Sequence, residues 1–205
     1  MNSDGDRFRL SRGDGASQIV ACIASLGDVA RLPARKVSSR FFDTFDWRLY
    51  GSGKAISVGP GRQGPEIQIF EKQGDRLFGT VQGDLTTGFS SDLPEGRLRD
   101  LVQDIIRVRR LLPRLDLISQ KTVIALRDGE GKSVLRLAVE NCNAQPPDGS
   151  PAKRLGTYLT MEPVRGYAGA YEKARKLLET RFTLGPAENA LYLDGLQAIG
   201  VTPGD

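Results

Sequence analysis

Histidine is absent from the 205 residues of this chain, and tryptophan occurs once. Without an imidazole, the chain cannot use histidine as a general base, as Ser-His-Asp hydrolases do, or as a zinc ligand. Cysteine is also scarce, and the spacing of Cys22 and Cys142 matches neither a metal site nor a disulfide framework. We therefore expect both thiols to be reduced and structural.

Long apolar runs are missing as well. Residues 1–10 contain no hydrophobic segment of the kind that directs secretion, so we expect a cytoplasmic protein without a membrane partner. Hydrophobic residues at 39% and charged residues at 26% are typical of a soluble globular domain. A net charge of +4 suits an anionic partner, but no nucleic-acid-reading motif is present, so nucleic acid is not the expected one.

Period-two alternation of apolar and polar residues recurs through most of the chain, between clusters of Gly, Pro, Asp and Ser. This pattern predicts a largely antiparallel sheet. Apolar residues at helical spacing predict helices over residues 17–26, 94–112, 167–182 and 186–199. The predicted strands lie near residues 6–11, 35–43, 53–59, 65–71, 76–82, 115–127, 132–141 and 154–163.

The alternation separates charged from apolar side chains on several of these strands. Arg7 and Arg9 alternate with Phe8 and Leu10, and successive side chains of a strand point to opposite faces. Such a sheet can have one solvated face and one face under helices. It can also close its polar face into a barrel, where converging cations would attract a polyanion such as phosphate.

Residues 39–58 contain the run Phe41-Phe42-Asp43-Thr44, followed by Asp46, Leu49 and Gly53. This spacing resembles the strand, turn and strand of CYTH proteins, the triphosphate tunnel metalloenzymes. Residues 159–167 resemble the closing strand and helix of those CYTH domains that precede a CHAD domain, and the similarity extends over residues 6–203.

The resemblance implies an α+β fold built on an eight-stranded antiparallel β tunnel (barrel) with flanking helices. It assigns residues 1–183 to a CYTH-like triphosphate-tunnel domain. Residues 184–205 would form a C-terminal helix and a linker towards a CHAD-type domain. CHAD domains take their name from histidines, and this chain contains none, so we expect that domain to be absent.

Proteins of this family bind triphosphate on basic side chains in the tunnel and hold Mg²⁺ or Mn²⁺ on glutamates. Their enzymes hydrolyse triphosphates or cyclise ATP. Glu140 and Glu162 stand at acidic positions of the family, so the resemblance makes them the candidate metal ligands. The candidate phosphate-binding residues are Arg7, Arg9, Arg40, Lys121, Arg127 and Arg136.

The chain departs from the family pattern at two motifs. The family opens with Glu-x-Glu-x-Lys, and placing Arg7 at the lysine leaves Ser3 and Gly5 where the glutamates belong. The other register offers Asp4 and Asp6 as the acidic pair but turns Arg7 and Arg9 away from the tunnel. Residues 56–59, Ile-Ser-Val-Gly, stand where the family has Leu-Arg-x-Arg.

We therefore expect a divergent CYTH-like domain that binds inorganic triphosphate or polyphosphate in a basic tunnel, with weak or no hydrolysis. A CHAD domain is a further partner that the family suggests. One alternative is an active Mg- or Mn-dependent inorganic triphosphatase with ligands at Asp4, Asp6, Glu140 and Glu162. A second alternative is a non-catalytic interaction scaffold whose tunnel is filled by ion pairs.

Overall fold

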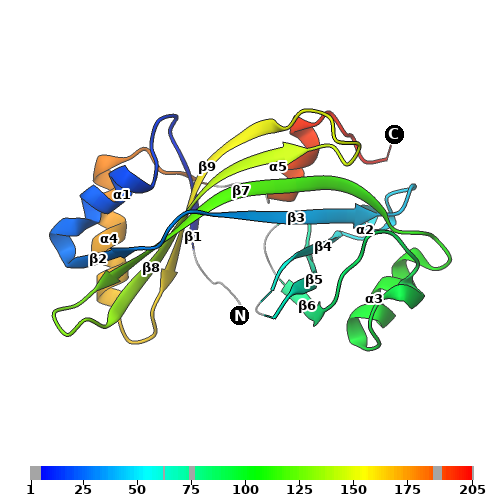
Figure 1. Cartoon of the computed structure of the whole chain (residues 1–205), viewed down its shortest axis with the longest axis horizontal. Coiled ribbons are helices and arrows are strands. Elements are labelled where there is room, and N and C mark those ends of the chain that lie inside the picture. Colours follow the sequence, from blue (N-terminus) through cyan, green and yellow to red (C-terminus); the bar gives the residue numbers. More distant parts are fainter. Residues whose placement is uncertain (1–5, 62, 74–76, 187–190, 205) are drawn as a thin grey trace. The chain divides into compact units, whose positions relative to one another are not determined.

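The computed structural model describes residues 6–61, 63–73, 77–186 and 191–204. Its elements are shown in Figure 1. The strands are β1 (Asp6–Leu10), β2 (Asp28–Arg31), β3 (Arg35–Asp43), β4 (Lys54–Pro60), β5 (Pro65–Glu71), β6 (Leu77–Gln82), β7 (Leu112–Arg127), β8 (Ser133–Gln145), β9 (Lys153–Pro163) and β10 (Gly185–Pro186). The α-helices are α1 (Ala16–Ile23), α2 (Arg48–Gly51), α3 (Arg97–Ile106), α4 (Ala168–Arg181) and α5 (Leu191–Ala198).

The strands form one mostly antiparallel sheet in the order β10-β1-β9-β8-β7-β3-β4-β5-β6, with β2 also paired to β7. Each of the eight predicted strands is present, and the short strands β2 and β10 were not predicted. The pairings among the described residues follow an open path from β10 to β6. Closure into a barrel is therefore not detected in this part of the chain.

The chain divides into two compact units. Unit 1 comprises residues 1–36, 119–142 and 156–188, and unit 2 comprises residues 37–118, 143–155 and 189–205. The long strands β7, β8 and β9 contribute residues to both units. None of the helices formed by the described residues is long and apolar enough to cross a lipid bilayer.

The core of unit 1 lies between the strands and the helices α1 and α4, which pack side by side (Figure 1). Phe8 and Leu10 of β1 join Leu159 of β9, Ile19 of α1 and Leu178 of α4 in one cluster. Full burial of a side chain of this size contributes about 2 kcal/mol. Because strand side chains alternate, the same packing turns Arg7 and Arg9 to the opposite face of β1.

The core of unit 2 lies on the face of β4 and β5 that α3 covers. Ile56 and Val58 of β4 pack with Ile67 of β5 and with Val102 and Ile106 of α3. The spacing of these two residues of α3 puts them on one stripe of the helix. The charged residues of α3 are thereby left on its exposed side.

The opposite face of β3 in unit 2 is covered by α5. Tyr192 is almost fully buried and stacks on Phe41, with ring centroids 5.0 Å apart. Gly195 allows the close approach of α5 to β7, since a Cβ at that position would lie 2.6 Å from Cδ2 of Leu115. Apolar side chains of β3 and β7 are therefore covered by α5 in this part of the sheet.

Two predicted helices differ from the observed ones. The helix expected over residues 94–112 ends at Ile106, because Arg107 adopts φ 55° and Leu111 pairs with Gly88 instead of continuing the helix. Leu111 is fully buried in the unit 2 core, which stabilises this pairing. The helix expected over 186–199 is observed as α5, and residues 187–190 of that prediction lie outside the described residues.

The turn between β3 and β4 is organised by the buried carboxylate of Asp43. Its Oδ1 accepts hydrogen bonds from the backbone N–H groups of Thr44 (2.7 Å) and Leu49 (3.0 Å), and its Oδ2 accepts one from Tyr50 (2.8 Å). Burial raises the pKa of Asp43, and these donors together with nearby Arg114 offset part of that rise. The carboxylate thereby fixes α2, a helix that the sequence pattern did not predict.

We predict that Asp43→Ala lowers the free energy of unfolding by about 3 kcal/mol, because buried N–H groups lose their acceptor. Urea denaturation followed by circular dichroism measures this change. Asp46→Ala is the matched control, since Asp46 lies in the same turn but forms half-exposed ion pairs with Arg48 and Arg109. Equal effects of the two substitutions would contradict the role assigned to Asp43.

Candidate functional site

The candidate site in unit 1 is the polar face of the strands β1, β9, β8 and β7. Arg7 is paired with Thr160 and Arg9 with Tyr158 across the β1–β9 ladder. Phe8 contacts the core cluster on the other face. The strand geometry therefore places Arg7 and Arg9 on the face that α1 and α4 do not cover.

Asp6 lies on the same face of β1 as Phe8 and is directed at α4. Its Oδ2 accepts a hydrogen bond from the hydroxyl of Tyr171 and lies 3.3 Å from Nη1 of Arg175. Asp6 is therefore directed away from the face of Arg7 and Arg9. Asp4, the other acidic residue of the alternative register, lies outside the described residues.

Lys121, Glu140 and Ser119 form the best-defined polar contact of this face. The Nζ of Lys121 lies 2.8 Å from Oε1 of Glu140, and the hydroxyl of Ser119 donates to Oε2 at 3.1 Å. The side chains of Lys121 and Glu140 are 28% and 21% exposed. Both carboxylate oxygens of Glu140 therefore have a partner, and the ion pair neutralises the charge of Lys121 in this structure.

Several charged side chains affect the pKa of the buried thiol of Cys142. Burial and, secondarily, the Glu140 carboxylate raise the pKa of Cys142, Arg7 and Lys121 lower it, and the net result is a pKa of about 12. Arg7, Lys121 and Glu140 are thus all close enough to affect the charge of this thiol. A thiol with this pKa is protonated at neutral pH, which agrees with the structural role expected for Cys142.

The other candidates of unit 1 are Arg9, Arg127 and Arg136. Arg9 lies against the backbone of Gly156, where a Cβ would be 3.4 Å from its Nε. Arg127 ends β7 beside Asp28 of β2. Arg136 is exposed and lies four residues before Glu140 on β8, a distance of roughly 13 Å along a strand.

Glu162 is half-buried on β9, two residues beyond Thr160, the partner of Arg7. Within the described part of the chain it makes no hydrogen bond or ion pair. The described residues contain no group of three or more acidic or thiol side chains that could bind a metal ion. With Glu140 engaged by Lys121, this donor set does not fit a dedicated divalent-metal centre.

Arg40 belongs to unit 2 and forms a bidentate ion pair with Asp116. Its Nε and Nη2 each lie 2.7 Å from a carboxylate oxygen, and the hydrogen bond with Asp116 raises the pKa of Arg40. Arg40 pairs with Val58 in the β3–β4 ladder and so shares the face that α3 covers. A phosphate ligand at Arg40 would have to compete with Asp116.

Ser57 and Gly59, which replace the two family arginines, lie on the face of β4 opposite to α3. Ser57 is buried and is paired with Phe41 and Gln68. A Cβ at Gly59 would lie 2.6 Å from Oγ of Ser39, so β3 and β4 approach each other closely here. The face of β4 is therefore closely packed at these two residues.

Two contacts were not predicted from the sequence. Ser119 precedes Lys121 by two residues on β7, so it shares its strand face, and this spacing was an available signal. Asp116, in contrast, pairs with a residue 76 positions away. No local pattern could have indicated that contact.

Solved structures match almost the whole chain. A protein of Bacillus halodurans described as a candidate adenylate cyclase aligns with 91% of this chain and 94% of its own, at 13% identity and a TM-score of 0.53. A candidate adenylyl cyclase of Hippeastrum, described as revealing a dominant triphosphatase activity, aligns with 98% of both chains at 14% identity and a TM-score of 0.54. Family models and curated proteins gave no match.

At these identities the likeness shows the fold alone. The chain has the α+β fold of CYTH-like proteins, as the resemblance of residues 39–58 implied. The comparisons do not distinguish the subgroup associated with CHAD domains.

We predict a stability change at high pH that depends on Tyr171. Burial, and secondarily the hydrogen bond to Asp6, raises the pKa of Tyr171 to about 12. The ordinary value is about 10, so this stabilisation is complete below pH 10 and is lost as the pH rises to 12. Urea midpoints of the wild type should therefore fall between pH 10 and 12, and those of Tyr171→Phe should fall less steeply.

Tyr192, whose pKa is also raised by burial, contributes to the decline in both proteins. Tyr167→Phe is the matched control, because Tyr167 packs against the same core cluster as Tyr171. A slope of Tyr171→Phe equal to that of Tyr167→Phe would show that neither the burial of Tyr171 nor its contact with Asp6 favours the neutral phenol.

Proposed function

We propose that this chain is a divergent CYTH-like domain that binds inorganic triphosphate or polyphosphate in the basic tunnel implied by its family resemblance. The observation that carries the proposal is that Lys121, held by Glu140 at 2.8 Å, lies on the polar face of unit 1 to which Arg7 of β1 also belongs. A cation pair of this kind, partly shielded from water, suits a ligand with several phosphate oxygens.

The Lys121–Glu140 ion pair supports the proposal on physical grounds. A lysine that is 28% exposed and holds a carboxylate at 2.8 Å is positioned to bind an anionic oxygen. In the bound state a phosphate oxygen would take the place of Oε1 of Glu140. Arg9, Arg127 and Arg136 would bind more distant phosphates of a longer chain, and the role of Arg40 stays a prediction.

Weak or absent hydrolysis is the second part of the proposal. Phosphoanhydride hydrolysis in this family relies on a divalent metal that polarises a phosphoryl group. The acidic donors in the described residues do not form such a centre. Residues 57 and 59 also lack the arginines that would hold the substrate against it. Glu162 remains the one proposed contact for a metal ion that enters with the phosphate.

Active triphosphate hydrolysis is the second candidate function, and the Hippeastrum structure favours it. Sustained phosphate release from tripolyphosphate that EDTA stops would establish it. Saturable heat without continuing turnover in a calorimetric titration would support binding alone. A CHAD-type domain stays a proposed partner, on the basis of residues 159–167.

We predict that the double substitution Arg7→Ala and Lys121→Ala weakens tripolyphosphate binding about 100-fold. Each lost charge-assisted hydrogen bond costs about 1.5 kcal/mol, and each 1.4 kcal/mol is a factor of ten. Titration calorimetry at low salt measures the dissociation constant.

Lys173→Ala is the control for the loss of one positive charge, because Lys173 is exposed on α4 and lies away from the polar face. An affinity of the double variant equal to that of Lys173→Ala would contradict the assigned site.

We predict that Glu140→Gln tightens metal-free tripolyphosphate binding about ten-fold, because the ligand no longer competes with an internal carboxylate for Lys121. The gain should shrink as salt rises, since screening weakens exposed charge interactions. Glu172→Gln on the exposed side of α4 is the control for net charge. Weaker binding by Glu140→Gln in the absence of metal would contradict the proposed competition.

A further inference from the structure

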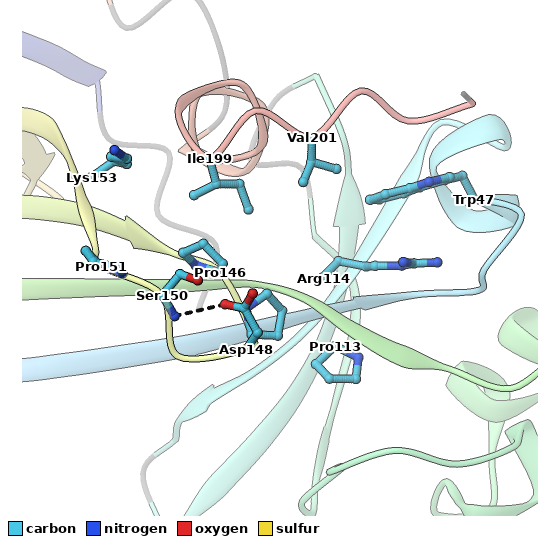
Figure 2. A pocket seen from close by; sticks show the side chains of 11 residues that line it. Trp47, Pro113, Arg114, Pro146, Asp148, Ser150, Pro151, Lys153, Ile199 and Val201 are labelled. Atoms are coloured by element: carbon cyan, nitrogen blue, oxygen red, sulfur yellow. Dashed lines mark hydrogen bonds between the residues drawn. The ribbon is translucent and has the colours of Figure 1, made fainter.

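Unit 2 contains a pocket of about 640 Å³ that shares no residue with the proposed phosphate site (Figure 2). Four segments form its wall: the β3–β4 turn, the start of β7, the β8–β9 connection with the first residue of β9, and the residues after α5. Figure 2 shows Ile199 and Val201 pointing towards the β8–β9 connection, with Trp47 and Arg114 on the other side. The volume lies in the range of small-molecule sites.

The wall of this pocket is rigid. Four of its residues are proline, whose ring fixes the backbone angle φ. In the β8–β9 connection, Asp148 accepts a hydrogen bond from the backbone N–H of Ser150 at 2.9 Å, and that contact lowers the pKa of Asp148. Gly149 donates to the carbonyl of Pro146 at 3.2 Å. A ligand would therefore lose little free energy to ordering the wall.

Trp47 is fixed in place by its surroundings. Its backbone adopts φ 55°, a left-handed conformation that is costly for a residue with a side chain. The guanidinium of Arg114 lies 4.6 Å from the indole centroid and donates to the carbonyl of Thr44 at 2.7 Å. The edge of Tyr50 approaches the indole with a centroid distance of 6.2 Å. The pocket is thus bordered by an aromatic ring of defined orientation.

The charges of the lining favour an anion. Arg114 and Lys153 are basic, whereas the single acidic residue, Asp148, is engaged in its own turn. Lys153 is exposed and makes no hydrogen bond or ion pair with another described residue. The remaining lining is mostly apolar, with Ile199 and Val201 opposite the prolines.

We propose that this pocket binds a small aromatic anion. The ring of the ligand would pack against the apolar residues of the wall beside Trp47, which is 8% exposed and carries Arg114 over its ring, and its negative group would face Lys153. Ring packing contributes apolar burial and aromatic contact, and the lysine orients the ligand.

The test uses Trp47, the single tryptophan of the chain, as the reporter. Energy transfer from Trp47 to 1-anilinonaphthalene-8-sulfonate is titrated on the full chain, and bound probe is displaced with unlabelled sulfonates. We expect saturable one-site transfer, with naphthalene-2-sulfonate displacing the probe at about ten-fold lower concentration than hexane-1-sulfonate.

Two variants locate the probe. Lys153→Glu should weaken binding about five-fold, because it reverses the charge that faces the negative group of the ligand. Val201→Tyr should weaken binding at least about ten-fold, because the larger side chain occupies part of the pocket. Lys132→Glu in the exposed β7–β8 turn is the charge-matched control and should bind as the wild type does. Circular dichroism melts establish that each variant is folded, and Lys153→Gln replaces Lys153→Glu if that variant is not.

Several results would overturn the proposal. Unsaturable transfer would mean that no defined site exists, and wild-type affinity in both folded variants would place the probe elsewhere. Equal displacement by hexane-1-sulfonate would remove the aromatic requirement. Displacement by tripolyphosphate at similar concentration would identify a general anion site that depends on charge alone.

Discussion

The alternation of side chains along each strand is the constraint on which the rest of this structure depends. Phe8 must enter the core beneath α4, and therefore Arg7 must leave it on the other face. The same relation in unit 2 buries Val58 under α3 and turns Ser57 and Gly59 the opposite way. Each core contact thus also decides which polar residues can meet a ligand.

This constraint explains why the strands and the face of Arg7 could be predicted from the sequence, since a period of two is visible in any single strand. The end of α3 could not be predicted. Residues 107–112 continue a plausible helical pattern, and only the pairing of Leu111 with Gly88, far away in the chain, ends it. The Arg40–Asp116 ion pair depends in the same way on strand order, which local periodicity does not contain.

In unit 2, a turn that resembles the family pattern is followed by a strand, β4, that departs from it. Asp43 satisfies N–H groups of the turn, so its role is structural and does not depend on any ligand. Ser57 lies only a few residues beyond that turn, yet its face is covered by apolar contacts such as Phe41 on Tyr192. The turn therefore carries the fold resemblance, and it gives no information about phosphate chemistry.

In unit 1, the carboxylate of Glu140 offsets the positive charge of Lys121 on the polar face. A basic face without a ligand repels itself, and one carboxylate at 2.8 Å from Lys121 relieves that repulsion. The same carboxylate cannot hold a metal strongly while it is engaged by Lys121 and Ser119. An anion that displaces Glu140 from Lys121 would release a carboxylate next to bound phosphate, where like charges repel. The proposed phosphate site and a metal ion at this face would therefore be coupled through one side chain, with the sign set by whether a cation enters together with the phosphate.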